Sequence, residues 1–291
     1  MKTPQEIISQ AISEWKPVQI VCLFSGGYDS MVMTHLVHTL DLHGVPTATW
    51  AVDTKLSADG WIKYINQVAA ELQFENLNIY DNGAGFEEYK RWVAEYGNPR
   101  TRTGHTRAYR RLKETAFNAI HMLYKQGKHD KTLFLSGMRK FESSDREKSM
   151  HFEVQRAGSS NKIFANPLFW WTDLDIARYR VQHDLPDNPF YDTVKGSGDC
   201  QCNWGNFITL GTLRIHSPIL AGGNVALLDD IGQRHGYGWD GEPVNIEPFF
   251  DTEEYWGECN LTTPFLCSNC SRQGRHRHNA AEEIMLQRGL F

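Results

Sequence analysis

The segment Ser25–Ser30 gathers two serines, two glycines and an aspartate directly after the apolar run of residues 18–24. The glycines let the backbone adopt a positive φ and approach a ligand closely, and a helix starting at Ser30 would point unpaired N–H groups and its positive dipole end at the same place. A plain strand-to-helix turn is the alternative, but apolar residues on both sides favour a nucleotide site. In such a site Asp29 caps the helix or holds a magnesium ion. The residues expected to hold phosphate are Ser25, Gly26, Gly27 and Ser30.

Another polar group follows the apolar residues 47–52. Asp53 stands there, where the carboxyl edge of an open α/β sheet binds ligands. A carboxylate that caps the helix expected from about Ala58 is an equally good interpretation. We therefore expect Asp53 either to contact the nucleotide or to begin the next helix.

A second glycine-containing turn follows the apolar residues 131–135. Ser136 and Gly137 allow close backbone approach, and Arg139 offers a planar fork that suits a phosphate. Glu142 is placed to hold Arg146. We expect Ser136 and Gly137 to bind the nucleotide, and Glu142 and Arg146 to bind the substrate. The alternative is a cluster of surface ion pairs.

Basic residues are concentrated in segment 97–113, although the chain has a formal net charge of -5. That charge argues against a general nucleic-acid coat, so any polyanion site must be local. The segment is either a solvated helix face or a surface that contacts phosphate or nucleic acid. Its candidate substrate-binding residues are Arg107, Arg110 and Lys113.

Four of the six cysteines form two short clusters, Cys200-x-Cys202 and Cys267-x-x-Cys270. Four thiolates suffice for a tetrahedral zinc site or an iron–sulfur cluster, and the spacing does not choose between them. Cys259 is a candidate substitute ligand or sulfur carrier, whereas Cys22 lies in an apolar strand and is expected to pack in the core.

Strand and helix patterns alternate through the first two thirds of the chain, which predicts an α/β fold with a mostly parallel, doubly wound sheet. The residue 163–168 strand is expected at an edge because Pro167 cannot donate to a ladder. Thr172 is the expected N-cap of the helix that follows it. The expected strands are 18–24, 47–52, 77–80, 131–135 and 163–168, and the expected helices are 31–43, 58–72, 86–96, 106–124 and 172–183.

Beyond about residue 196 the pattern becomes irregular and rich in glycine, aromatic residues, cysteine and histidine. We expect a nucleotide-binding domain over 1–195 and a Cys-rich, metal-binding region over 196–291. With 291 residues, 41% of them hydrophobic, the chain can bury a sizeable core. We find neither a signal-peptide pattern nor an apolar stretch long enough for a membrane helix, so we expect a cytoplasmic protein.

The six residues Ser25–Ser30 match SGGxDS, and the chain thereby resembles the PP-loop ATP pyrophosphatases. Asp53-Thr54 and the segment 136–146 are similar to the 3′-phosphoadenylylsulfate reductase branch of that superfamily, although Lys55 replaces an expected glycine. The resemblance implies an adenine nucleotide alpha hydrolase-like fold and cleavage of ATP between its α and β phosphates. DNA phosphorothioation enzymes of this branch combine such a loop with an iron–sulfur cluster, which favours iron slightly over zinc here.

The resemblance predicts an ATP pyrophosphatase that uses Mg²⁺, adenylates a substrate and supports sulfur transfer, with nucleic acid as the acceptor and a sulfur-donor protein as a partner. Ser25, Asp29 and Arg139 are the expected catalytic residues. The intact loop, and a final segment without cysteine, argue against simple sulfate reduction. Two alternatives remain: an adenylating enzyme with structural zinc, and a nucleotide-binding regulator without turnover.

Overall fold

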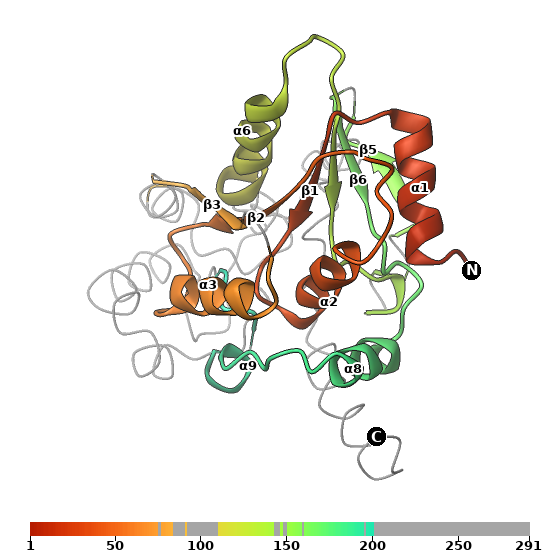
Figure 1. The fold of residues 1–291 in the computed structure, drawn as a ribbon. Coiled ribbons are helices and arrows are strands. Elements are labelled where there is room, and N and C mark those ends of the chain that lie inside the picture. Colours follow the sequence, from red (N-terminus) through yellow and green to blue (C-terminus); the bar gives the residue numbers. More distant parts are fainter. Residues whose placement is uncertain are drawn as a thin grey trace, which may run out of the picture.

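A computed structural model of the chain describes residues 1–74, 77–83, 91, 110–142, 146–147, 150–158, 160–194 and 196–200. The fold of this part is a twisted sheet with helices packed on it (Figure 1). Its helices are α1 (Pro4–Trp15), α2 (Tyr28–Val37), α3 (Trp61–Glu71), α6 (Thr115–Tyr124), α8 (Asp173–Gln182) and α9 (Phe190–Thr193), with a π-helical turn η1 (Arg110–Glu114) and a 3₁₀ turn η2 (Lys140–Glu142).

Six strands form the sheet in the order β3-β2-β1-β4-β6-β5. Neighbouring strands are parallel except β5, which runs antiparallel to β6. The order places β1 between β2 and β4, at the point where the chain changes direction across the sheet. Open α/β sheets bind ligands at the carboxyl ends of such strands. The strands are β1 (Gln19–Leu23), β2 (Thr47–Asp53), β3 (Leu77–Asp81), β4 (Thr132–Leu135), β5 (Val154–Arg156) and β6 (Lys162–Ala165).

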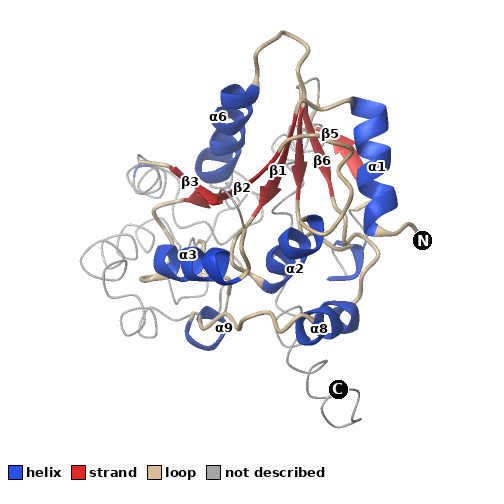
Figure 2. Cartoon of the chain, viewed as in Figure 1, coloured by secondary structure: helices blue, strands red, loops and turns tan. Residues whose placement is uncertain are grey.

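Alternate residues of the strands enter two separate cores. Ile20 and Cys22 pack in one cluster with residues of α1, α2, α3 and α8, whereas Val21 and Phe134 pack in the other with Phe117 and other residues near α6. Figure 2 shows α6 on one side of the sheet and α1 and α2 on the other. Both faces are therefore covered, as parallel sheets require, and the predicted doubly wound α/β fold is confirmed.

Local patterns set several element ends as predicted. Thr172 caps α8 through a reciprocal capping box with Asp175. Cys22 is fully buried in β1, where burial raises the pKa of its thiol to about 12. The expected strands at 18–24, 47–52, 77–80 and 131–135 are all present with shifted ends.

Three expectations about elements are wrong. β6 is not an edge strand, because it ends at Ala165, before Pro167, and β5 pairs along its outer side. α2 begins at Tyr28 rather than near Met31 and ends at Val37, before residue 43. α3 begins three residues later than expected, after the left-handed Gly60. The helix expected over 86–96 lies outside the described residues except at position 91, as do residues 106–109 of the next one.

Within the part of the chain that the structure describes, none of the helices has the length and apolar character needed to cross a bilayer.

Gly137, just beyond β4, lies against the first turn of α2. A Cβ atom added there would come within 2.6 Å of the carbonyl carbon and oxygen of Asp29 and 2.8 Å of the Ser30 nitrogen. Since these are backbone atoms, they cannot rotate out of the way as a side chain can. The absence of a side chain at position 137 thus fixes how closely the start of α2 approaches the end of β4.

We expect Gly137→Ala to destabilise the protein by about 1–3 kcal/mol, because the added methyl group overpacks this contact. Thermal or denaturant unfolding measures the change. Gly83→Ala is the matched control, since a Cβ there would meet only the Asp81 carboxylate at 3.9 Å. Equal stability of the two variants would contradict the close-approach argument.

Candidate nucleotide-binding site

The turn between β1 and α2 has a backbone that depends on one of its two glycines. Gly26 has a φ of +77°, in the left-handed region that favours glycine. Gly27 has an ordinary φ of −74°, so the expectation of positive φ at both positions is wrong. Gly27 is the N-cap residue of α2, and no side-chain hydrogen bond caps that helix end, although Ser25, Tyr191 and Ser197 lie close to it.

The two serines of the turn bind each other. Ser25 Oγ lies 3.0 Å from Ser30 Oγ, and the Ser30 hydroxyl donates to the carbonyl oxygen of Gly27 at 2.8 Å. The Ser25 N–H donates to Ser30 Oγ at 3.2 Å. These contacts close the turn on itself and hold both hydroxyls beside the start of α2.

Side chains from distant parts of the chain hold the carbonyl groups of the turn. The Trp61 indole donates to the carbonyl of Ser25 at 3.0 Å, and the Tyr64 hydroxyl donates to that of Gly26 at 3.2 Å. The Asn188 amide, which is nearly fully buried, also donates to the Gly26 carbonyl, at 2.9 Å. With these carbonyl groups engaged, the turn is held in one conformation before any ligand arrives.

Arg139 is fully buried between two carboxylates. Its Nε forms an ion pair with Asp29 Oδ2 at 3.1 Å, and its Nη2 donates to Asp173 Oδ1 at 2.8 Å. Burial alone would lower the pKa of Arg139, but the charges of Asp29, Glu142 and Asp173 outweigh it and raise that pKa. A direct contact of Arg139 with phosphate stays a prediction. In the structure its guanidinium contacts the aspartate of the turn.

The remaining predicted residues after β4 have partners within the protein. Ser136 donates its hydroxyl to the Asn166 side-chain oxygen at 2.6 Å. Arg146 forms an ion pair with Glu142, the contact expected from the sequence. Neither observation tests whether these residues bind a ligand.

Asp53 ends β2 and lies in a small charged cluster at the carboxyl edge. It accepts hydrogen bonds from the Lys55 N–H at 2.9 Å and the Ser57 hydroxyl at 3.2 Å. The Lys55 ammonium bridges Asp53 and Asp81, at 2.8 and 2.7 Å. Lys55 has a φ of +62°, the region that glycine adopts without strain, so the turn keeps a glycine-type backbone although the residue is lysine. α3 begins after Gly60, so Asp53 does not cap it.

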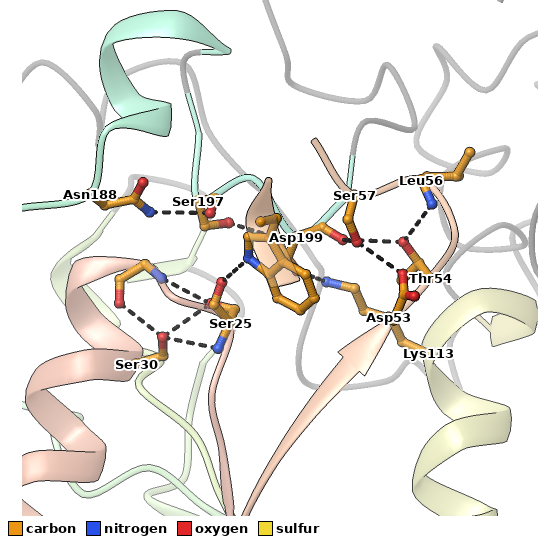
Figure 3. Close-up of polar contacts among 12 residues, drawn as sticks. Ser25, Ser30, Asp53, Thr54, Leu56, Ser57, Lys113, Asn188, Ser197 and Asp199 are labelled. Carbon is orange, nitrogen blue, oxygen red and sulfur yellow. Dashed lines mark hydrogen bonds and ion pairs between the residues drawn. The ribbon is translucent and has the colours of Figure 1, made fainter. Parts of the chain in front are cut away.

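Residues 197–199 cross between the turn that joins β1 to α2, here called the phosphate turn after its expected ligand, and the loop after β2 (Figure 3). The Asn188 amide that binds Gly26 also donates to the Ser197 carbonyl, at 3.1 Å. The Asp199 carbonyl accepts from the hydroxyls of Thr54, at 3.1 Å, and Ser57, at 3.2 Å. This segment therefore ties the two loops together and places Cys200 immediately beyond them.

Lys113, one of the predicted substrate-binding residues, pairs with this crossing segment. It comes from η1, and its ammonium lies 2.5 Å from Asp199 Oδ2. Burial would raise the pKa of Asp199, but the Lys113 charge and hydrogen bonds outweigh it and hold that pKa below its usual range. The basic segment thus meets the crossing segment 197–199, beside the loop after β2, at Lys113.

Other predicted residues lie outside what the structure describes. These are Arg107, the Arg110 side chain, Cys202, Cys267 and Cys270. Cys200 is described and is partly buried. Among the described residues no group of three or more His, Cys, Asp or Glu side chains is arranged to hold a metal ion.

The sequence analysis missed Asn188, Asp173 and Asp199 as residues that shape the site. Asn188 lies in the segment Leu185–Tyr191, whose residue types indicate turns and packing. Its hydrogen-bond partner Gly26 is 162 positions away in the sequence. Asp173 reads as an acidic residue of a helix first turn. Asp199 is adjacent to Cys200, the one local signal that could have drawn attention to it.

A mostly parallel sheet with an SGGxDS turn after a central strand defines a PP-loop nucleotide-binding protein. The chain belongs to the family described as the phosphoadenosine phosphosulfate reductase domain, whose model matches residues 19–218. The match begins at β1 and includes the phosphate turn, the turn after β4 and the Cys200 segment.

Individual relatives are more distant. An uncharacterized protein of Methanocaldococcus jannaschii is 28% identical over 61% of this chain, and the match spans only 34% of that protein. An adenosine 5′-phosphosulfate reductase of Bacillus mycoides is 26% identical over 67% of this chain and 76% of its own length. The crystal structure of the Candida auris phosphoadenylyl-sulfate reductase with phosphate has 20% identity, a TM-score of 0.48, and coverage of 68% of this chain and 88% of that chain.

Proposed function

We propose that the chain binds ATP with Mg²⁺ at the turn after β1 and cleaves it between the α and β phosphates to adenylate a substrate. The observation that carries the proposal is the intact SGGxDS turn at the N-terminus of α2, held by Trp61, Tyr64 and Asn188. Preorganised donors that face a leaving pyrophosphate stabilise charge as it develops. The Bacillus mycoides relative is named for a nucleotide of the same chemical class.

Each residue of the turn has a role in this proposal. N–H groups at the start of α2 and the hydroxyls of Ser25 and Ser30 hold the departing phosphates. Asp29 supplies a carboxylate oxygen, the ligand type that Mg²⁺ prefers, so the residues present fit that ion. Mg²⁺, when bound, neutralises phosphate charge. Arg139 keeps the Asp29 carboxylate in place through their ion pair.

Ser25→Ala is expected to weaken ATP binding, because it removes a hydroxyl from the phosphate turn. A hydrogen bond to a charged group contributes about 1.5–3 kcal/mol, or roughly a 10- to 100-fold change in affinity. Calorimetry with MgATP and an assay of pyrophosphate release measure the effect. Ser9→Ala on α1 is the control. Unchanged affinity and unchanged pyrophosphate release in Ser25→Ala would contradict the proposed site.

We further propose that the adenylated substrate is a nucleic acid. The support is the concentration of basic residues in segment 97–113 and the contact of Lys113 with the crossing segment through Asp199. A protein that binds phosphates releases counterions, so its affinity for nucleic acid falls steeply with salt. A sulfur-donor protein would then supply the transferred atom.

Charge reversal at Arg107 or Arg110 is expected to weaken binding to DNA or RNA and to reduce the salt slope by about 1 for each lost phosphate contact. Titrations at several salt concentrations measure both quantities. Lys128→Glu is the control, since Lys128 is exposed between α6 and β4, away from the carboxyl edge. If wild-type protein binds no nucleic acid at low salt, the acceptor is a small molecule instead.

We also propose that Cys200, Cys202, Cys267 and Cys270 bind one metal centre that serves sulfur transfer, with an iron–sulfur cluster favoured over zinc. The support is the two short thiol clusters in the sequence and the position of Cys200 directly after the crossing segment. Binding one ion or cluster would close the long loop between the clusters and organise the C-terminal region.

Cys202→Ser or Cys270→Ser is expected to release the metal while ATP binding persists, because each variant removes one of four ligands. Metal analysis and absorption spectra of anaerobically purified protein check this. Cys22→Ala is the control, since Cys22 is buried in β1. Zinc in place of iron would favour the adenylating enzyme with a structural metal. Wild-type protein that contains neither iron nor zinc would contradict the proposal that the four cysteines bind one metal centre.

A further inference from the structure

Asp29, Arg139 and Asp173 form a continuous chain of charged groups between two helices. Asp29 belongs to the first turn of α2, and Asp173 is the first residue of α8. Arg139 comes from the loop after β4 and lies between them, with Nε on Asp29 at 3.1 Å and Nη2 on Asp173 at 2.8 Å. The guanidinium is fully buried.

This geometry determines which nitrogen of Arg139 faces Asp29. A guanidinium is planar, so a partner on one of its nitrogens fixes the direction of the others. Asp173 takes Nη2, and the carbonyl of Trp171 accepts from Nη1 at 3.3 Å. With those two nitrogens occupied, Nε is the nitrogen that lies beside Asp29, at ion-pair distance but without a hydrogen bond to it.

We propose that Asp173 is a positioning residue for the Asp29 carboxylate and acts on it through Arg139. A buried cation needs compensating charge, and here Asp29 and Asp173 supply it in direct contact, with Glu142 as a further nearby charge. If Asp173 were neutral, Arg139 would turn towards Asp29 alone and hold its carboxylate more strongly, in a different orientation. Outer partners of this kind are known to orient groups that bind metal ions. The inference rests on the proposed function, in which Asp29 binds the Mg²⁺ of MgATP.

The chain offers a matched control two residues away. Asp175 also lies in the first turn of α8, where it accepts hydrogen bonds from the N–H and hydroxyl of Thr172, both at 2.7 Å. Asp173→Asn and Asp175→Asn therefore make the same change of charge near the same helix end. Only the first of them alters the contact with Arg139.

The test is the affinity for MgATP measured by calorimetry over a range of Mg²⁺ concentrations, alongside pyrophosphate release. We expect Asp173→Asn to raise the half-saturating Mg²⁺ concentration by about 10-fold, the size of effect seen for outer partners of metal-binding groups. Asp175→Asn should lower thermal stability through its lost cap and keep the wild-type Mg²⁺ dependence. In an Asp29→Asn background, Asp173→Asn should have no further effect on MgATP binding.

Two results overturn the inference alone: wild-type Mg²⁺ dependence in Asp173→Asn, or an equal rise in Asp175→Asn. An undiminished effect of Asp173→Asn in the Asp29→Asn background does the same, because the action would then not pass through Asp29. Wild-type protein that fails to bind MgATP overturns the proposed function and this inference together. Failure of the inference alone, seen in the variants, is thus distinguishable from failure of the proposed function, seen in wild-type protein.

Discussion

The close approach of Gly137 to the backbone of Asp29 and Ser30 is the constraint on which the rest of the site depends. It joins the carboxyl end of β4 to the first turn of α2, across the point where the sheet changes direction. Because no side chain separates the two backbones, Arg139, two residues further on, reaches Asp29 from within the core. A longer distance between β4 and α2 would take the Asp29 carboxylate away from a buried arginine, which is costly.

The turn between β1 and α2 is held by side chains from other parts of the chain. The carbonyl groups of Ser25 and Gly26 accept hydrogen bonds from Trp61, Tyr64 and Asn188. A turn held in this way needs little reorganisation when negative charge develops on a bound group, which is how preorganised sites lower a barrier. The crossing segment 197–199 connects this turn to the loop after β2, so that Cys200 follows directly from the two loops.

Much of the fold could be predicted because its signals are local. Apolar runs followed by glycine or aspartate predicted β1, β2 and β4, and Thr172 as an N-cap predicted the start of α8. α1 has an equally local capping pattern, Thr3-x-x-Glu6, from which it was predictable. β5 is three residues long and half-buried throughout, so it carries no alternation, and without it β6 was mistaken for an edge.

The site was harder to predict because its contacts are not local. The types of Arg139 and Asp29 suggested phosphate and magnesium, but their pairing depends on the docking of α2 against β4, which no short pattern encodes. Lys113 and Asp199 are 86 positions apart in sequence and meet only through the fold. Residue type thus suggested a chemistry for the site, whereas tertiary packing decided which of these groups contact one another.

The most direct test of the central claim is the identity of the products when wild-type protein is incubated with ATP, Mg²⁺ and a nucleic-acid or small-molecule acceptor, followed by phosphorus NMR. The account predicts pyrophosphate together with AMP or an adenylated acceptor, because the turn after β1 is placed to hold the two departing phosphates as a unit. Formation of ADP and inorganic phosphate would contradict it, since the bond cleaved would then be the one between the β and γ phosphates.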